Sequence, residues 1–242
     1  MNLPRVAFLA ADTHRSRAYA QALLAKGIGL GSALLITSPN RQRWGQTESF
    51  DAGNLEFGRV FAPDLGIPLE DSLARLCGST STLDAGTVND PRVVEWLRDS
   101  AASLAVYSGF GGQIVKPDIL GAAPALLHMH SGWLPDYRGS TTIYYSYLLE
   151  GWCGVSAILL REAIDTGPIV ARQRYPAPPP GADVDYCYDS AIRADLLTSV
   201  VANWATHERF TDPTAQTPHT GKDYYIMHPV LKHVALNKIH EV

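Results

Sequence analysis

The stretch that decides the fold is RVAFLAADTHRSRAYAQALLAKGIGLGSALLIT, residues 5–37. It opens with a short, continuous apolar run at residues 5–11, which is typical of a strand buried on both faces. Thr13 can cap the helix that follows, and two glycines end that helix. A second apolar run at residues 33–37 completes a strand–helix–strand unit. The sequence therefore predicts a sheet whose first strands are parallel.

The rest of the chain continues this alternation of apolar runs and helical patterns. We expect further strands at residues 103–107, 125–130, 155–160 and 169–175, the last two as a hairpin, and helices at 68–76, 91–99, 116–120, 141–150, 185–206 and near the C-terminal end. These elements predict an α/β fold, namely an open, twisted, mostly parallel sheet with helices on both faces. A proline-rich run near residue 180 separates an expected catalytic domain, residues 1–182, from a C-terminal helical extension, residues 183–242, packed on the same domain.

Composition excludes several classes of protein. The chain has 242 residues, 46% hydrophobic and 18% charged, which is globular composition. Its formal net charge of −4 argues against a nucleic-acid partner. Three widely spaced cysteines make neither a disulfide framework nor a zinc knuckle. No leader pattern and no apolar stretch of membrane-spanning length is seen, so we expect a cytoplasmic protein without a membrane partner.

The stretch HMHSGWLPDYRGSTT, residues 128–142, places two histidines at the end of an expected strand. Strand alternation points the side chains of His128 and His130 to the same face. Three interpretations remain open: two metal ligands, a general base with a second donor, or core-edge histidines satisfied by the backbone.

Two further features follow the ends of expected strands. Asp165 in REAIDTGPIV is either a turn residue or the carboxylate that orients a histidine base. The glycines of SGFGGQ, residues 108–113, either expose backbone to a flat ligand or form an ordinary loop.

The motifs HMHSGWLPDYRGS and AIDTGPIV, in this order, resemble the folate-dependent formyltransferase family, over roughly residues 5–180. That family includes glycinamide ribonucleotide, methionyl-tRNA and nucleotide-sugar N-formyltransferases. The matching residues are His130, Leu134, Pro135, Arg138 and Gly139 in the first motif, and Asp165, Gly167, Pro168 and Ile169 in the second. One departure stands out, because His128 occupies the position of the family's catalytic asparagine.

The resemblance implies a Rossmann-like formyltransferase fold and transfer of a formyl group from N10-formyltetrahydrofolate to an amine. It implies that His128 donates to the oxyanion, His130 transfers the proton and Asp165 orients His130. The residues implied to hold the cofactor are Gly111, Gly112, Gln113, Ile114, Val115, Glu162, Ala163 and Ile164. The residues expected at the substrate are Arg15, Arg138, Gly139, Ser140 and Thr141. Arg15 opens the first helix, where it either helps to hold a phosphate or is simply solvated.

The acidic charge and the chain length favour a small-molecule amine over tRNA, such as a nucleotide-linked amino sugar or a natural-product amine. With water in place of the amine, the same site would be a formyltetrahydrofolate hydrolase. A metal-dependent hydrolase using His128, His130 and Asp165 is a further alternative, but we expect no metal, because a third strong ligand near the histidines in sequence is missing. The last alternative is a non-catalytic scaffold of the same fold, or a domain that carries out acyl transfer or hydrolysis with another acyl donor. The C-terminal HPVLKHVALNKI, residues 228–239, either makes a homodimer contact or packs back on the sheet.

Overall fold

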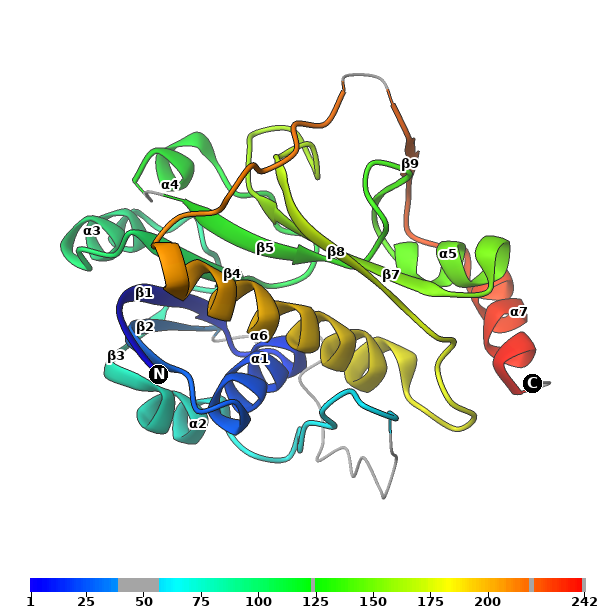
Figure 1. Cartoon of the computed structure of the whole chain (residues 1–242), viewed down its shortest axis with the longest axis horizontal. Helices are drawn as coiled ribbons and strands as arrows, with labels where there is room; N and C mark the ends of the chain where they lie inside the picture. The colour runs from blue at the N-terminus through cyan, green and yellow to red at the C-terminus, as the bar shows by residue number, and fades with distance from the viewer. Residues whose placement is uncertain (39–56, 123–124, 218–219, 241–242) are drawn as a thin grey trace.

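The computed structural model of the protein describes residues 1–38, 57–122, 125–217 and 220–240 (Figure 1). Within these residues the chain forms a seven-stranded sheet of order β3-β2-β1-β4-β5-β7-β8 and a two-stranded sheet, β6-β9. The strands of the large sheet are β1 (Asn2–Ala11), β2 (Gly29–Thr37), β3 (Cys77–Asp84), β4 (Leu104–Ser108), β5 (Leu126–His130), β7 (Cys153–Leu159) and β8 (Ile169–Tyr175). The five strands from β3 to β5 are parallel, and β7 and β8 run antiparallel. The predicted α/β sheet, parallel first and antiparallel late, is confirmed.

Helices cover both faces of the sheet because its central strands are apolar on both. Val6, Phe8 and Ala10 of β1 join one core cluster, and their neighbours Ala7 and Leu9 join the other. The helices are α1 (His14–Ala25), α2 (Leu69–Leu76), α3 (Pro91–Asp99), α4 (Pro117–Ala122), α5 (Thr142–Glu150), α6 (Asp189–His207) and α7 (Pro229–His240). The first core cluster contains side chains of α1, α2 and α6, and the second contains those of α3 and α4.

Three strands were not expected from the sequence. β3 is exposed along most of its length at the edge of the sheet, so it lacks the apolar run that marks a buried strand. β6 (Tyr137–Gly139) and β9 (Lys222–Tyr224) have three residues each and pair in parallel. The polar sequence from 38 to 66 predicts an irregular region, and residues 39–56 of it lie outside the described part of the chain.

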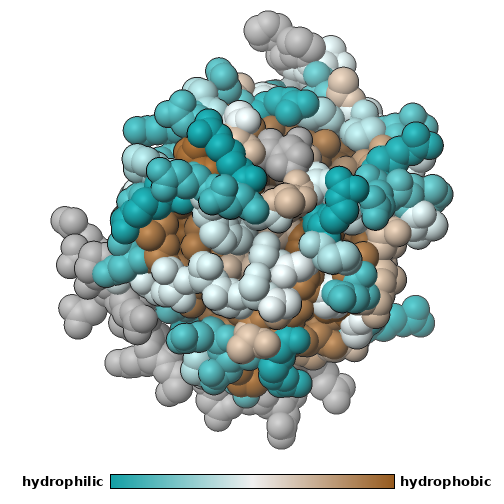
Figure 2. All heavy atoms as spheres, turned by 90° about the vertical axis from the view of Figure 1, so that its left-hand side faces the viewer, coloured by the Kyte–Doolittle hydropathy of each residue, from teal (hydrophilic) through white to brown (hydrophobic). Residues whose placement is uncertain are grey.

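The face of the molecule shown in Figure 2 has no large continuous apolar patch among the residues that the structure describes. That face presents mostly hydrophilic and intermediate side chains, and its apolar areas are small and separated. In the part of the chain that the structure describes, no helix combines the length and apolar character needed to cross a membrane.

The strand order creates a switch point between β1 and β4. β1 pairs with β2 on one side and with β4 on the other, so the connections leaving β1 and β4 diverge. In open α/β sheets, ligands bind in the crevice beyond the carboxyl ends of strands at such a point. The N-terminus of α1, the loop after β4 and the end of β5 meet there.

Candidate active site

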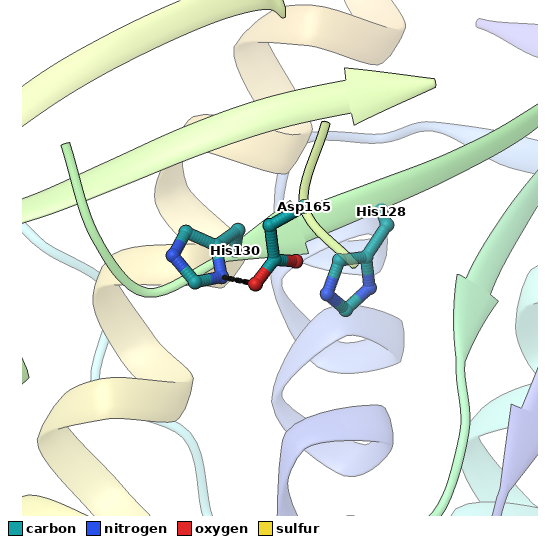
Figure 3. Close-up of side chains that lie close together, drawn as sticks. All are labelled: His128, His130 and Asp165. Atoms are coloured by element: carbon teal, nitrogen blue, oxygen red, sulfur yellow. Dashed lines mark ion pairs between the residues drawn. The ribbon is translucent and has the colours of Figure 1, made fainter. Parts of the chain in front are cut away.

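Strand β5 delivers both motif histidines to this crevice. Leu127 and Met129 alternate with the histidines and are fully buried in the core that α6 covers. His128 and His130 therefore point to the opposite face, as strand alternation predicts. Figure 3 shows both imidazoles beside the carboxylate of Asp165, which comes from the loop between β7 and β8.

The ring of His130 is fixed by a backbone hydrogen bond. Its Nε2 lies 2.7 Å from the carbonyl oxygen of Tyr137, and because a carbonyl only accepts, Nε2 carries a proton. Its Nδ1 lies 3.3 Å from Oδ2 of Asp165. Burial lowers the pKa of His130, and the Asp165 carboxylate opposes that effect. The pair is thus an imidazole whose free nitrogen faces a buried carboxylate.

Asp165 has an unusual backbone conformation and is held by two neighbouring residues. Its backbone lies in the left-handed region, with φ of 54°, which aspartate tolerates better than most residues. The N–H of Gly139 donates to Oδ2 at 2.9 Å. Gln216 donates from Nε2 to the carbonyls of Asp165 and Gly167, at 2.7 Å each. An unusual backbone conformation that the surroundings enforce is common at functional sites.

His128 is partly buried, and one of its ring nitrogens lacks a hydrogen-bond partner. Its Nδ1 is buried and makes no hydrogen bond of normal geometry. The residue lines the cavity described below, and a nitrogen of its ring lies on the side of Asp165 (Figure 3). Burial, followed by the charges of Arg15 and Arg193, holds the pKa of His128 well below its usual value. The ring is therefore neutral at pH 7 and carries one proton on one of two nitrogens.

A cavity of about 990 Å³ opens on these three side chains. All the sequence-predicted site residues line it, and they fall into three groups: the centre at His128, His130 and Asp165; the walls at 111–115 and 162–164; and the substrate side at Arg15, Arg138, Gly139, Ser140 and Thr141. The structure thus brings together residues that are spread over 150 positions of the sequence. Their roles remain proposals, which we develop below.

The two basic groups expected at the substrate differ in how they are engaged. Arg15 donates from Nε to Oγ of Ser108 at 3.2 Å and from its terminal nitrogen to the carbonyl of Gly109. Within the described ranges, no carboxylate lies within 4.0 Å of its guanidinium. Arg138 instead contacts the C-terminal segment, through the carbonyl of Thr220 and through Asp223, whose Oδ1 lies 3.4 Å from Nε.

Sequence reasoning missed two contributors to the cavity. Asp189 and Arg193 on α6 form an ion pair at 2.8 Å, and Ser131 donates to the same aspartate. An oppositely charged pair four residues apart in an otherwise apolar helix was the available signal. The second contributor is the segment 223–226, which begins within β9 and also lines the cavity. Nothing in its sequence indicates that it meets the motif loop.

A sheet with this switch point, and a histidine–carboxylate pair in a cavity beyond its strands, are features of an α/β enzyme. A family model of formyl transferases matches residues 5–194. The chain belongs to the formyl transferase family. Members of this family take their formyl group from N10-formyltetrahydrofolate.

Individual relatives agree with this assignment. The methionyl-tRNA formyltransferase of Chloroflexus aurantiacus (strain ATCC 29366 / DSM 635 / J-10-fl) is 33% identical over 140 residues, which are 56% of this chain and 44% of that protein. The chain thus spans less than half the length of the curated relatives it matches. A sugar N-formyltransferase from Shewanella sp FDAARGOS_354 shares the fold, with a TM-score of 0.56 and 15% identity over 96% of this chain and 86% of that one. Glycinamide ribonucleotide transformylase 1 from Symbiobacterium toebii also shares the fold, with a TM-score of 0.57 and 14% identity over 88% of this chain and 93% of that one.

Proposed function

We propose that this chain transfers the formyl group of N10-formyltetrahydrofolate to the primary amine of a small molecule. The observation that carries the proposal is the His130–Asp165 pair, 3.3 Å apart and buried, at the bottom of the cavity walled by residues 111–115 and 162–164. Family membership supplies the class of donor, and the geometry supplies the groups that the reaction needs.

The walls of the cavity suit the flat pterin ring of a folate. Ile114 and Ile164, one in each wall segment, are 59% and 56% exposed, which is unfavourable for two large apolar side chains unless a ligand covers them. Around them, glycine backbone at 111 and 112 leaves N–H and C=O groups accessible, as the hydrogen-bonding edge of a pterin requires. When bound, the donor supplies an amide-like formyl carbon for attack by the amine.

His130 is the group placed to take the proton that the attacking amine loses. Its Nε2 proton is held by Tyr137, so Nδ1 is the atom that accepts. The cation that results lies 3.3 Å from the Asp165 carboxylate, which stabilises it. Gly139 keeps that carboxylate in place through its N–H.

His128 faces the same space and supplies a donor when its proton is on Nε2. In that tautomer its N–H can stabilise the negative charge that develops on the formyl oxygen, the role that an asparagine amide has in the family. A preorganised donor of this kind is worth about 10²–10³-fold in rate. The substitution of asparagine by histidine therefore keeps the required chemistry in one of the two neutral tautomers.

We propose that the acceptor carries an acidic group, such as a phosphate or carboxylate, near Arg15. That guanidinium lines the cavity and, among the described residues, has only neutral oxygens of Ser108 and Gly109 as partners. Its neighbour Arg17 is engaged elsewhere, by Asp12 at 3.1 Å and the carbonyl of Leu65 at 2.7 Å. A nucleotide-linked amino sugar or an acidic natural-product amine meets this requirement, and the net charge of −4 favours such molecules over tRNA.

Two further expectations also stand as proposals. The division into a catalytic domain, residues 1–182, and an extension, residues 183–242, is one. The other is a homodimer contact through α7, which supplies a candidate face: Ala235 and Ile239 are buried, whereas Val230 and Val234 are 67% and 50% exposed.

The test is turnover with a panel of amines. Protein treated with a chelator is incubated with N10-formyltetrahydrofolate and, separately, with amino sugars linked to nucleotides, amino acids and amines without an acidic group. Tetrahydrofolate release is followed optically, and the formylated amine by mass spectrometry. We expect release that depends on an acidic amine and is lost in His130→Ala. Release at the same rate without any amine would instead identify a hydrolase, and no release under any condition would contradict the proposal.

A further inference from the structure

The centre of the site brings three hydrogen-bond acceptors to one point. Ligand-type atoms of His128, His130 and Asp165 all lie within 4.8 Å of one another (Figure 3). The Nε2 proton of His130 is donated to the carbonyl oxygen of Tyr137, so Nδ1 of the same histidine presents a lone pair to Asp165. An asparagine at position 128 would offer an N–H to this group, and a histidine there removes that obligatory donor.

The second tautomer of His128 completes the set. Tyr107, its partner across the β4–β5 register, offers a backbone acceptor that raises the pKa of His128. With the proton on the buried Nδ1, beside the protein, Nε2 turns a lone pair to the cavity. Two imidazole lone pairs and a carboxylate then converge, and these are ligand atoms that a divalent transition-metal ion accepts.

One separation in this cluster matches the distance between two ligands of the same metal ion. The 3.3 Å between His130 Nδ1 and Asp165 Oδ2 is longer than the 2.7–2.9 Å usual for charged N–H···O bonds. Two ligands at about 2.0–2.1 Å from a tetrahedral ion lie about 3.3 Å apart. The far nitrogens of both histidines face backbone, and the carboxylate accepts from Gly139, which is the arrangement that orients ligands in metal sites.

We propose that His128, His130 and Asp165 form a site for one divalent transition-metal ion of the zinc, cobalt or iron(II) class. Two imidazoles and one carboxylate are ligands that these ions share, and the cavity leaves the remaining positions open. The sequence lacked a third ligand close to the histidines, and the loop between β7 and β8 supplies it.

Neighbouring charges set the strength of this site. Arg193 is neutralised by Asp189 at 2.8 Å, but no carboxylate in the described ranges pairs with Arg15. That guanidinium lowers the affinity for a cation, so Arg15→Met should bind the metal more tightly than the native chain. The inference rests on the ligand geometry and not on the proposed reaction. Metal on Nδ1 of His130 and Nε2 of His128 occupies both groups assigned to formyl transfer, so the loaded protein should be inactive in that reaction.

The experiment is a titration of chelator-treated full-length protein with Co²⁺, followed by visible ligand-field absorption, with Zn²⁺ added in competition. We expect one Co²⁺ per chain, displaced by Zn²⁺. His128→Asn and Asp165→Asn should each lose about 100-fold in affinity or more. His233→Asn is the matched control, since that histidine is exposed on α7 and away from the cluster. Circular dichroism establishes that each variant is folded.

Three results would overturn the proposal: no change in absorption with the native protein, equal affinity in His128→Asn, or loss in His233→Asn as large as in His128→Asn. Formyl transfer is assayed on the same chelator-treated sample without metal. Transfer without metal binding would remove the metal site and leave the proposed function intact. Metal binding without transfer under any condition would do the reverse.

Discussion

Replacement of Asp165 by asparagine is the sharpest perturbation of the proposed reaction. Asparagine tolerates the φ of 54° at this position, and its side-chain oxygen can still accept from the N–H of Gly139. The fold should therefore be preserved. The change removes one negative charge that lies 3.3 Å from Nδ1 of His130, where a proton resides during transfer.

The size of the effect follows from that distance and from burial. The side chains of His130 and Asp165 are only 5% and 10% exposed, so solvent screens them weakly. At an effective dielectric constant of about 20, two unit charges 3.3 Å apart interact by about 5 kcal/mol. If this energy stabilises the transition state and not the ground state, kcat falls about 10³–10⁴-fold in the variant.

The assay is tetrahydrofolate release at saturating donor and amine, with calorimetric binding of 5-formyltetrahydrofolate to show that donor affinity is unchanged. Asp223→Asn is the control, because that carboxylate also lines the cavity but is 77% exposed, and its pairing with Arg138 contributes about 0–1 kcal/mol. Its kcat should change by about twofold or less. A kcat within tenfold of the native value in Asp165→Asn would refute the assignment of His130 and Asp165 as the proton-transfer pair.

Three other changes have defined outcomes. Gly139→Ala should destabilise the fold by at least about 2 kcal/mol, lowering Tm by about 4–8 °C, because φ is 97° and an added Cβ would lie 2.1 Å from the carbonyl oxygen of Tyr224. Gln216→Ala should lower kcat and cost about 1 kcal/mol per lost hydrogen bond in urea unfolding, since it releases the loop that carries Asp165. Burial, then Arg17, lowers the pKa of His14, so folded-state stability should fall as pH drops below about 6.5. His128 and His130, whose pKa values are also lowered by burial, contribute to the same fall, so His14→Gln should reduce the slope without abolishing it.

The first two of these changes have matched controls. Gly111→Ala places its Cβ in open space, with no heavy atom within 4 Å, and should leave Tm unchanged. Gln173→Ala changes an exposed residue of β8 and should stay within about 0.5 kcal/mol of the native stability. A His14→Gln variant with the native slope between about pH 7 and pH 5 would show that another group controls acid stability.

The fold was predictable where a strand is buried on both faces, because such a strand has a continuous apolar sequence. The apolar runs at 5–11 and 33–37 became β1 and β2, because both faces of these strands are covered by helices. β3 was missed because its polar, glycine-containing sequence lies exposed at the sheet edge, where no alternation is required. The pairing of β6 with β9 depends on contacts between distant three-residue segments, which local patterns do not encode.

The site was predictable to the extent that its residues follow strand ends within recognisable motifs. His128, His130 and Asp165 lie in two such stretches, and the structure brings them together in one cavity. Asp189 and Arg193 escaped notice because they sit inside a long helix whose other residues explain it as core. Sequence spacing also could not show that Arg138 is engaged by the C-terminal segment, since that contact is purely tertiary.

The most direct test of the central claim is calorimetric titration of chelator-treated protein with 5-formyltetrahydrofolate, a stable mimic of the donor. We expect one site per chain, with a dissociation constant on the order of micromolar, without added metal. The same titration in the presence of Zn²⁺ reports separately on the metal site. No detectable heat with the metal-free, folded protein would contradict the claim that this cavity holds a formyl-folate.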